Sequence, residues 1–550
     1  MKARKLHFLS IDAMPWSMLQ QFLGRGSLPN FSRLEKEGAS AQGMVAPGPD
    51  ATTPPAHAAL LCGCPAQDHG IYSYEEPVIE NGVIHPWKKR SGFDAWRLQA
   101  EPLWVGFLRA GRKTALLHFP LSSPVEAYTT GQKFGADFSD RLVVLESFSR
   151  RLTPEIVRKD VDSDGSFNLR LSDSSKIPLP LRAPKAPEPA VFKEKAGGLW
   201  RLRFSSGSAS EPDIHFLTAF SSVAGNRPDL AAEYLENVGP FVASGATYSY
   251  GTDKLGPRVY KGGSGLAEER LLQSLELLAD HYQKAVRFVI GKIQPEAAFC
   301  YFNGLDLCLH LWRAYLDPSS AAYRPRIFKT LFPAVERMFS AADALVGYLL
   351  EISGPQDLLV VVSDHGMAPI ESIFYPNQVL VDAGYAVWDF KDEAPVLAQS
   401  RAVYNESNSG YIILNLESRG GVVPDSQAGR LTAEIAALFE PFLGSALDKI
   451  AFPSQDPEIP NLGEIYLFPK FKVTLQEEVE GKLIDREFVG GQHHYWCGCE
   501  EMKAVLYFWG AGVPAGRNLG LRSHLEVAPT IAELCGVPRP NKAGREPIGF

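Results

Sequence analysis

The stretch Leu358-Leu-Val-Val-Val-Ser-Asp-His-Gly366 indicates the fold more clearly than any other part of this 550-residue chain. Its first five residues are apolar and rich in valine, a composition typical of a strand buried on both faces of a parallel sheet. Asp364 and His365 then lie at the carboxyl end of that strand, where open α/β sheets bind their ligands. Because carboxylate and imidazole groups are common metal ligands, the stretch predicts a metal or ligand site at this sheet edge.

Similar short apolar runs recur along the chain and are separated by helical patterns. We expect core strands at residues 6–11, 113–120, 297–302, 358–362 and 504–509, and a long helix at 327–350. Strands that alternate with helices favour right-handed crossovers into one sheet. The predicted fold class is therefore α/β, with a doubly wound, mostly parallel sheet and helices on both of its faces.

The alternation of strands and helices is interrupted in two regions, residues 151–285 and residues 385–490, and we expect each to be an inserted α+β segment. Residues 177–189 are rich in proline, which a central strand does not tolerate, and residues 200–204 alternate like an antiparallel strand. Excursions of this kind from a rigid sheet often shape a ligand pocket. The predicted organisation is a discontinuous core at residues 1–150 and 286–550, an inserted cap or accessory domain at 151–285, and a smaller pocket-shaping insertion at 385–490.

Composition narrows the range of partners and locations. The net charge of −8 and the lack of a dense basic cluster argue against a nucleic-acid polymer or an anionic lipid surface. The apolar run at residues 6–11 is too short for a signal sequence, and no run approaches the roughly 18 apolar residues of a membrane span. Seven cysteines are too few for a disulfide framework. We expect a cytoplasmic protein that acts on a small molecule.

Aspartate and histidine residues follow several of the predicted strands. Asp12 ends the first strand, where it could also be an ordinary helix cap. Asp306 and His310 are spaced to share one helix face, as in helical zinc sites, although a surface pair would have the same spacing. His493 and the adjacent His494 lie on a glycine turn. The candidate metal ligands, sufficient for two ions with open coordination positions, are Asp12, Asp306, His310, Asp364, His365 and one of the pair His493 and His494.

The segment Thr52-Thr-Pro-Pro-Ala-His-Ala-Ala-Leu-Leu-Cys-Gly63 predicts a short helix with a hydroxyl group at its start. Pro54 suits the first turn and Gly63 suits the position after the last, which would place Thr53 at the N-cap. The positive field of a helix N-terminus favours an alkoxide and a bound phosphate, so Thr53 is a candidate nucleophile as well as an ordinary cap. His57 could orient a substrate, but its apolar neighbours favour packing inside the protein.

The order of these motifs resembles the alkaline phosphatase superfamily. It is most similar to the type I phosphodiesterase/nucleotide pyrophosphatase family and its bacterial phosphohydrolase and phosphomutase relatives. The stretches Leu28-Pro-Asn-Phe-Ser-Arg-Leu-Glu-Lys-Glu-Gly38, Asp68-His-Gly-Ile71 and Val527-Ala-Pro-Thr-Ile-Ala-Glu-Leu-Cys-Gly536 support the match. The resemblance extends over roughly residues 5–150 and 290–540 and implies an alkaline-phosphatase-like core.

The resemblance also implies which residues act together. One divalent metal ion would be bound by Asp12, Thr53, Asp364 and His365, and a second by Asp306, His310 and His493. His493 is preferred over His494 because it occupies the family's position after Gly491 and one intervening residue. Zinc is the usual metal of the family, with manganese or iron as alternatives.

The implied activity is hydrolysis of a small-molecule phosphoester, most simply a phosphodiester, through a covalent phospho-threonine on Thr53. Three alternatives are a phosphate or phosphonate monoester hydrolase, a phosphomutase, and a binding protein that lacks catalysis. The chain departs from nucleotide-cleaving members at Tyr74, where they carry an asparagine that donates to a phosphoryl oxygen. Tyr74 could donate in its place with a different geometry, which makes it a candidate substrate contact.

Overall fold

The computed structural model describes most of the chain. It covers residues 2–550 except 46–50, 81–82, 148–150, 153–155, 162–166, 172–175, 180–188, 194–198, 209–210, 217–219, 222, 240, 243–244, 406–409, 457–458, 488 and 494–498, and it describes only the backbone at 45, 79, 83–87, 151–221 and 242. His494 therefore lies outside the described residues.

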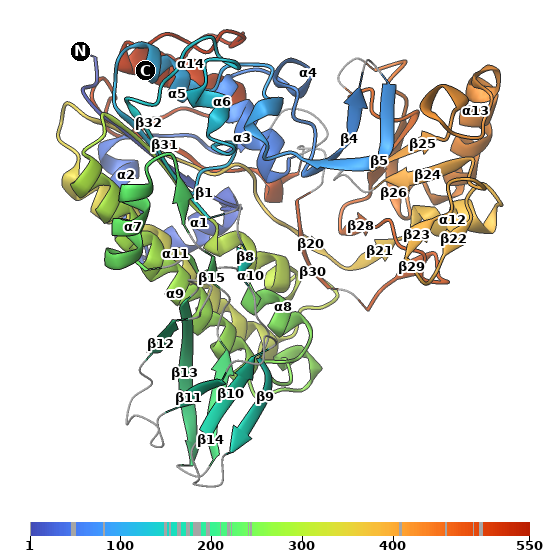
Figure 1. Cartoon of the computed structure of the whole chain (residues 1–550), viewed down its shortest axis with the longest axis horizontal. Helices are drawn as coiled ribbons and strands as arrows, with labels where there is room; N and C mark the ends of the chain where they lie inside the picture. Colours follow the sequence, from blue (N-terminus) through green and yellow to red (C-terminus); the bar gives the residue numbers. More distant parts are fainter. Residues whose placement is uncertain are drawn as a thin grey trace.

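A nine-stranded sheet, counted among the described residues, forms the centre of the molecule (Figure 1). Its order is β16 (Ala224–Gly225), β7 (Leu142–Glu146), β6 (Thr114–Leu117), β18 (Ala297–Phe302), β1 (Leu6–Ile11), β19 (Leu358–Val362), β31 (Leu506–Gly510), β2 (Ala39–Ser40) and β32 (Arg517–Asn518). The five strands from β7 to β19 are parallel. The predicted α/β class with a mostly parallel sheet is confirmed.

Strand β31 differs from its parallel neighbours in direction. It pairs antiparallel with β19, and the amide of Ser363 just beyond β19 donates to the carbonyl of Val505 just before β31. The chain thus enters β31 at the edge where β19 ends. Without a crossover helix to carry it to the other edge first, it can only return antiparallel.

Helices cover both faces of the sheet because the side chains of its strands alternate between two apolar cores. In β1, Leu9 and Ile11 belong to one core, while Leu6 and Phe8 belong to the other. The first core includes α1 (Trp16–Gly24), α2 (Pro29–Glu37), α9 (Leu266–Phe288), α10 (Gly304–Trp312) and α11 (Pro325–Ile352), the long helix predicted from the sequence. The second includes α3 (Thr53–Cys62), α5 (Leu103–Arg109) and α14 (Val527–Cys535). None of the described helices combines the length and apolar character needed to cross a bilayer.

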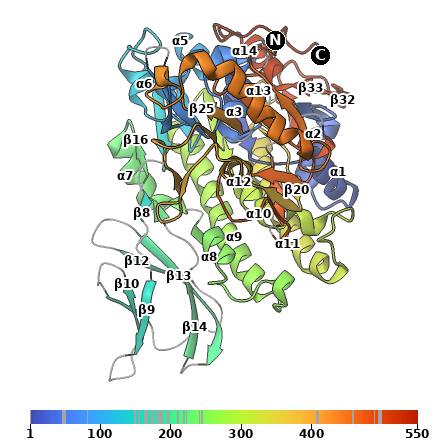
Figure 2. The same cartoon turned by 90° about the vertical axis from the view of Figure 1, so that its right-hand side faces the viewer.

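Two groups of antiparallel strands project from the central sheet. One contains β12 (Pro189–Lys193), β13 (Leu199–Ser208) and β14 (Glu211–Phe216), drawn in green at the lower end of Figures 1 and 2. The antiparallel strand expected from the alternation at residues 200–204 is therefore present within β13.

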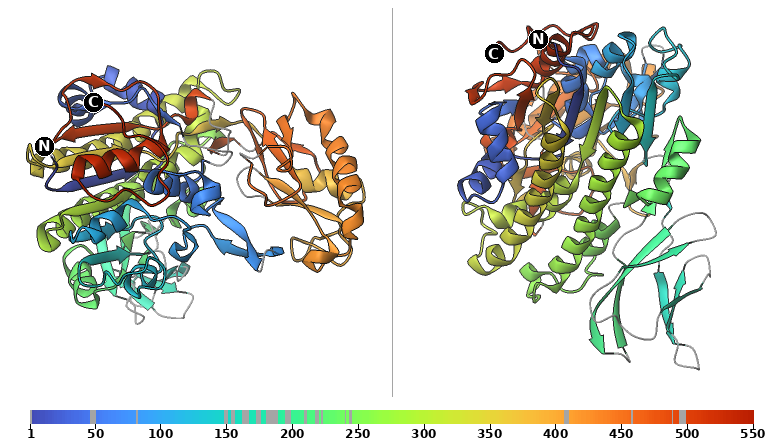
Figure 3. Two further views of the ribbon diagram at one scale, coloured as in Figure 1. Left: turned by 90° about the horizontal axis from the view of Figure 1, so that it is seen from above. Right: turned by 90° about the vertical axis from the view of Figure 1, so that its left-hand side faces the viewer.

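The second projection is an accessory lobe with its own apolar core. It contains the four-stranded sheet β24 (Ala402–Asn405), β25 (Tyr411–Leu414), β27 (Ile465–Pro469) and β26 (Leu447–Ala451), together with α12 (Pro376–Asp382) and α13 (Ala428–Phe439). Seen from above, the hairpin of β4 (Glu75–Glu80) and β5 (Val83–Ser91) reaches from the core toward this lobe (Figure 3). An ion pair of 3.0 Å between Lys89 of β5 and Glu477 connects the hairpin to the lobe. The division of the chain into domains stays a prediction.

Asp343 in α11 ties that helix to the start of α2. Its carboxylate accepts from the backbone amides of Asn30 at 3.1 Å and Phe31 at 2.8 Å, and from the Asn30 side chain at 2.8 Å. These bonds satisfy amides in the first turn of α2, which have no partner within the helix. The buried carboxylate therefore joins two helices that pack on the same face of the sheet.

Replacing Asp343 tests this link. Asp343→Ala should lower the free energy of unfolding by about 2–3 kcal/mol, because it leaves buried donors without an acceptor. Asp343→Asn keeps one acceptor oxygen, so its free energy of unfolding should fall by a smaller amount. Urea denaturation measures both variants, and equal losses in the two would contradict the role assigned to these hydrogen bonds.

Candidate metal centre

The candidate ligands meet because three adjacent parallel strands end at the same edge. In β1 and β19, Ser10 pairs with Val362, and continuing this register by two residues places Asp12 beside Asp364. On the other side of β1, the amide of Asp12 donates to the carbonyl of Phe302 at the end of β18. Helix α10 begins two residues after β18 and brings Asp306 and His310 to the same edge.

The first group of side chains surrounds the Nε2 atom of His365. This atom lies 3.3 Å from Asp12 Oδ1 and 3.3 Å from Asp364 Oδ2. The Nδ1 atom of the same ring lies 2.9 Å from the carbonyl oxygen of Gly366, to which it can only donate. In a neutral ring, Nε2 is then left with a free lone pair directed at the two carboxylates, the arrangement typical of a metal-binding histidine.

The second group is formed by Asp306, His310 and His493. Asp306 Oδ1 lies 3.1 Å from His310 Nε2 and 3.9 Å from His493 Nε2. The Nδ1 atom of His310 lies 2.9 Å from the carbonyl oxygen of Gly491, which orients this ring as Gly366 orients His365.

A tight contact between β30 (Gly490–Gln492) and α10 delivers His493 to this group. A Cβ atom at Gly491 would lie 2.4 Å from the carbonyl oxygen of Leu309 in α10, so only glycine permits the approach. Strand β30 also pairs with β20 (Ala368–Ile370), which follows shortly after His365. The glycine turn seen in the sequence is thus required by backbone packing.

The two groups are contiguous. The rings of His365 and His493 stack with their centroids 3.8 Å apart and their planes 13° apart. Potential ligand atoms of Asp12, Asp306 and His365 lie within 4.8 Å of one another, as do those of Asp306, His310 and His493. The six predicted ligands therefore form one continuous cluster.

Burial and mutual repulsion perturb the carboxylates of this cluster. Burial raises the pKa of Asp364 to about 8. It also raises the pKa of Asp12 well above its usual range, and the nearby charges of Asp364 and Asp306 add to the effect. Burial opposes ionisation of Asp306 as well, but His310 outweighs it and the pKa of Asp306 is lowered. Despite its own burial, His310 has its pKa raised to about 9 by Asp306.

The cluster fits divalent cations. Three of its buried atoms, Asp12 Oδ1, Asp364 Oδ2 and His365 Nε2, have no hydrogen-bond partner among the described residues, while Asp306 Oδ1 is paired with His310. A buried carboxylate oxygen that accepts no hydrogen bond is costly, and a cation compensates it directly. Mixed oxygen and imidazole donors suit zinc and other first-row metals.

Helix α3 is linked to the first group through His57, and Thr53 lies one position further into the helix than expected. Thr52 is the N-cap of α3, and Thr53 is its first residue. Pro54 and Pro55 then occupy the second and third positions, which both accept proline because amides of the first turn have no acceptor within the helix. Gly63 adopts the left-handed conformation predicted for it, with φ 66°. The Thr53 carbonyl lies 2.8 Å from His57 Nδ1, which is itself 3.3 Å from Asp364 Oδ2.

The structure places the two candidate substrate contacts in different environments. His57 is completely buried, and burial lowers its pKa to about 3, which favours the packing interpretation. Tyr74 is 50% exposed, and its ring packs edge-on against Phe93 with the centroids 5.0 Å apart. A role for Tyr74 in substrate binding stays a prediction.

Two supporting residues escaped the sequence analysis. The Tyr301 hydroxyl donates to Asp12 Oδ2. Ser363 Oγ accepts from the amide of Met14 at 2.9 Å and donates to the carbonyl of His365 at 2.7 Å. Tyr301 carries a hydroxyl in the otherwise apolar strand β18, and Ser363 is the first polar residue after the apolar strand β19. A polar group at such a position is the signal that could have identified each residue.

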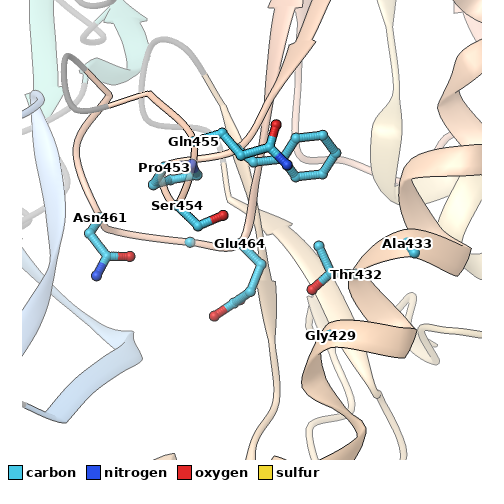
Figure 4. Close-up of a pocket in the computed structure, with 10 residues that line it drawn as sticks. Gly429, Thr432, Ala433, Pro453, Ser454, Gln455, Asn461 and Glu464 are labelled. Carbon is cyan, nitrogen blue, oxygen red and sulfur yellow. The ribbon is translucent and has the colours of Figure 1, made fainter.

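A separate cavity of about 380 Å³ lies in the accessory lobe (Figure 4). Its lining includes Thr432 of α13 and the polar residues Gln455, Asn461 and Glu464. Glu464 is already paired with Arg419 at 2.7 Å. Because none of the candidate ligands lines this cavity, it is distinct from the cluster at the sheet edge.

The raised pKa of Asp364 predicts how the metal-free protein responds to pH. Folded Asp364 holds its proton to about pH 8, whereas an unfolded aspartate loses it near pH 4. The folded state therefore binds more protons in this window, so the free energy of unfolding should fall as pH rises through it. Urea denaturation in EDTA measures this slope. Asp364→Asn should flatten it, and identical slopes for variant and wild type would contradict the assignment.

Comparison with known proteins identifies the family. The sequence model for type I phosphodiesterase/nucleotide pyrophosphatase matches residues 6–496. A search of curated protein sequences found no significant match.

Among solved structures, murine ectonucleotide pyrophosphatase/phosphodiesterase 5 is similar with a TM-score of 0.50 and 14% identity, covering 100% of this chain and 98% of that one. The human protein has a TM-score of 0.52 and 13% identity, with the same coverage. An inactive threonine-to-alanine variant of the murine protein, in complex with AMP, has a TM-score of 0.51 and 13% identity, and the match again covers 100% of this chain and 98% of that one. These likenesses agree in fold, and the family match spans most of the sequence. The chain belongs to the type I phosphodiesterase/nucleotide pyrophosphatase family of phosphoester hydrolases, within the alkaline phosphatase superfamily.

Proposed function

We propose that this chain is a two-metal phosphodiesterase with Thr53 as its nucleophile. The observation that carries the proposal is the convergence of six metal-ligand candidates, four of them buried, at a sheet edge that His57 links to the first turn of α3. Family membership supports it independently. The solved murine variant supports the choice of nucleophile, because replacing a threonine by alanine is described as inactivating that protein.

We assign the candidate residues to two ligand sets. Asp12, Asp364 and His365, together with the Thr53 hydroxyl, would hold one cation. Asp306, His310 and His493 would hold the other. Zinc suits this mixed set, with manganese and iron as alternatives. Bound divalent cations would supply Lewis acidity, favouring the alkoxide form of the hydroxyl and neutralising charge on the phosphoryl oxygens.

The protein's own residues would then act in two displacements. In the first, Thr53 Oγ loses its proton and attacks phosphorus, an oxygen–phosphorus bond forms, and the bond to the leaving alcohol breaks. In the second, water attacks the phosphorus of the phospho-threonine, the bond from phosphorus to Thr53 Oγ breaks, the oxygen regains a proton, and the phosphate monoester leaves. The Thr53 amide and the positive end of the α3 dipole would favour the phosphoryl oxygens in both steps, whereas Pro54 and Pro55 carry no N–H to donate.

The proposed substrate is a small phosphodiester. The murine relative was captured with AMP, which makes nucleotide-containing diesters reasonable first candidates here. Phosphate and phosphonate monoesters and phosphomutase substrates remain the alternatives for the same site. A cytoplasmic location likewise stays a prediction.

Substrate preference can be measured directly. Zinc-loaded protein should show a higher kcat/KM with bis-p-nitrophenyl phosphate than with p-nitrophenyl phosphate. The reverse preference would assign the site to monoester chemistry and would indicate that Tyr74 and its neighbours form a different phosphoryl pocket.

Replacing the nucleophile should separate catalysis from metal binding. Thr53→Ala should lower kcat by about 10³-fold or more, because no other group at that position can form the covalent bond. The six remaining ligands should still bind zinc, as measured by calorimetry. Thr52→Ala is the matched control. Loss of activity in Thr52→Ala, with Thr53→Ala near normal, would transfer the role to the neighbouring threonine.

The second ligand set has its own test. His310→Ala should lose one of the two bound zinc ions, because it removes one of the three ligands in that set, and activity should fall with it. Elemental analysis of the dialysed protein gives the stoichiometry. Unchanged metal content and activity would show that the second site is assigned to the wrong residues.

A further inference from the structure

The ring of His57 lies directly beneath the first ligand set and contacts three separate parts of the chain. Its Nε2 atom is 2.8 Å from Ser10 Oγ in β1. Its Nδ1 atom is 2.8 Å from the Thr53 carbonyl oxygen and 3.3 Å from Asp364 Oδ2. One buried side chain therefore joins the central strand, the first turn of α3 and a predicted metal ligand.

These contacts determine which nitrogen carries the proton. A carbonyl oxygen only accepts hydrogen bonds, so Nδ1 must donate to Thr53. In a neutral ring, Nε2 is then an acceptor, and the Ser10 hydroxyl is the group that donates to it. The same Nδ1–H also faces Asp364 Oδ2 at 3.3 Å, an electrostatic contact rather than a full hydrogen bond.

Aromatic neighbours hold the ring in this orientation. Phe119 and Tyr301 both meet it edge-to-face, with centroid distances of 5.6 Å and 5.5 Å. The Tyr301 hydroxyl donates in turn to Asp12. His57 and Tyr301 together thus form a layer between the apolar core and the carboxylates of the first ligand set. Full burial leaves His57 no surface with which to touch a substrate.

We propose that His57 is a positioning residue whose Nδ1–H holds the Asp364 carboxylate and the first turn of α3 in a fixed relative position. The inference rests on the proposed function, because the geometry it preserves is that between Thr53 and the first cation. His57 takes no part in bond making or breaking. A loss of its N–H should therefore reduce zinc affinity and kcat, while KM stays close to its wild-type value.

Two isosteric substitutions separate the roles of the two ring nitrogens. The amide nitrogen of asparagine can occupy the position of Nδ1, whereas the end of a glutamine side chain reaches the position of Nε2. His57→Asn should therefore keep most of the wild-type kcat with bis-p-nitrophenyl phosphate. His57→Gln should lower kcat about 10- to 100-fold and weaken zinc binding by a similar factor, as outer-shell changes at metal sites do.

A buried histidine elsewhere on the same strand provides the matched control. His7 in β1 pairs through Nδ1 with Ser353 Oγ at 2.7 Å, and it lies at the end of the strand away from the cluster. His7→Gln should lower the melting temperature but leave kcat and zinc affinity unchanged. It thereby separates the cost of altering a buried imidazole from the cost of losing the contact to Asp364.

The outcomes distinguish the two proposals. Equal, low rates for wild type and Thr53→Ala would reject the proposed function, and zinc affinity would still report on His57. An active wild type with His57→Gln unimpaired in both readouts would overturn the positioning role alone. So would equal impairment of His57→Asn and His57→Gln.

A measurement on the wild type covers the case in which the variants fail to fold. Nitrogen NMR of histidine-labelled protein should show His57 protonated at Nδ1 and unprotonated at Nε2. The opposite tautomer would overturn the proposal, because Nδ1 would then have no proton to donate to Thr53 or Asp364.

Discussion

Parallel pairing of β1 with β18 on one side and β19 on the other is the constraint on which the rest of the structure depends. Neighbouring strands lie about 4.8 Å apart, so residues that follow adjacent strand ends come within reach of a common ion. The register aligns Leu6 with both Ala297 and Leu358, and the three strands end together. A slip of one residue would exchange the faces to which β1 directs its side chains and would move Asp12 away from Asp364.

The same arrangement concentrates like charges where water is scarce. Asp12 and Asp364 are both buried, and their raised pKa values record the cost of ionising them without a cation. A cluster optimised for stability alone would not place these groups together. The surrounding fold tolerates them because two large apolar cores cover the faces of the sheet, and because Tyr301 and the Gly366 carbonyl orient individual ligands.

Precision in the cluster depends on contacts between segments that are distant in the sequence. Gly491 allows β30 to approach α10 closely enough for His493 to join Asp306 and His310. His57 connects β1, α3 and the end of β19 through one ring. The accessory lobe, by contrast, has its own apolar core and its own cavity, and none of the candidate ligands lines that cavity (Figures 1 and 4).

The sequence by itself determined five of the nine strands of the central sheet and the α/β class, because apolar periodicity is a local property. The order of the Asp, His and Thr motifs likewise predicted which residues are candidate ligands. Only the tertiary structure decided that Thr52 caps α3, that β31 runs antiparallel, and that Tyr301 and His57 lie beneath the carboxylates. Helix caps differ by a single residue, which a pattern of prolines does not resolve. Strand direction and the contacts of a buried ring depend on where distant segments pack, and no local pattern encodes that.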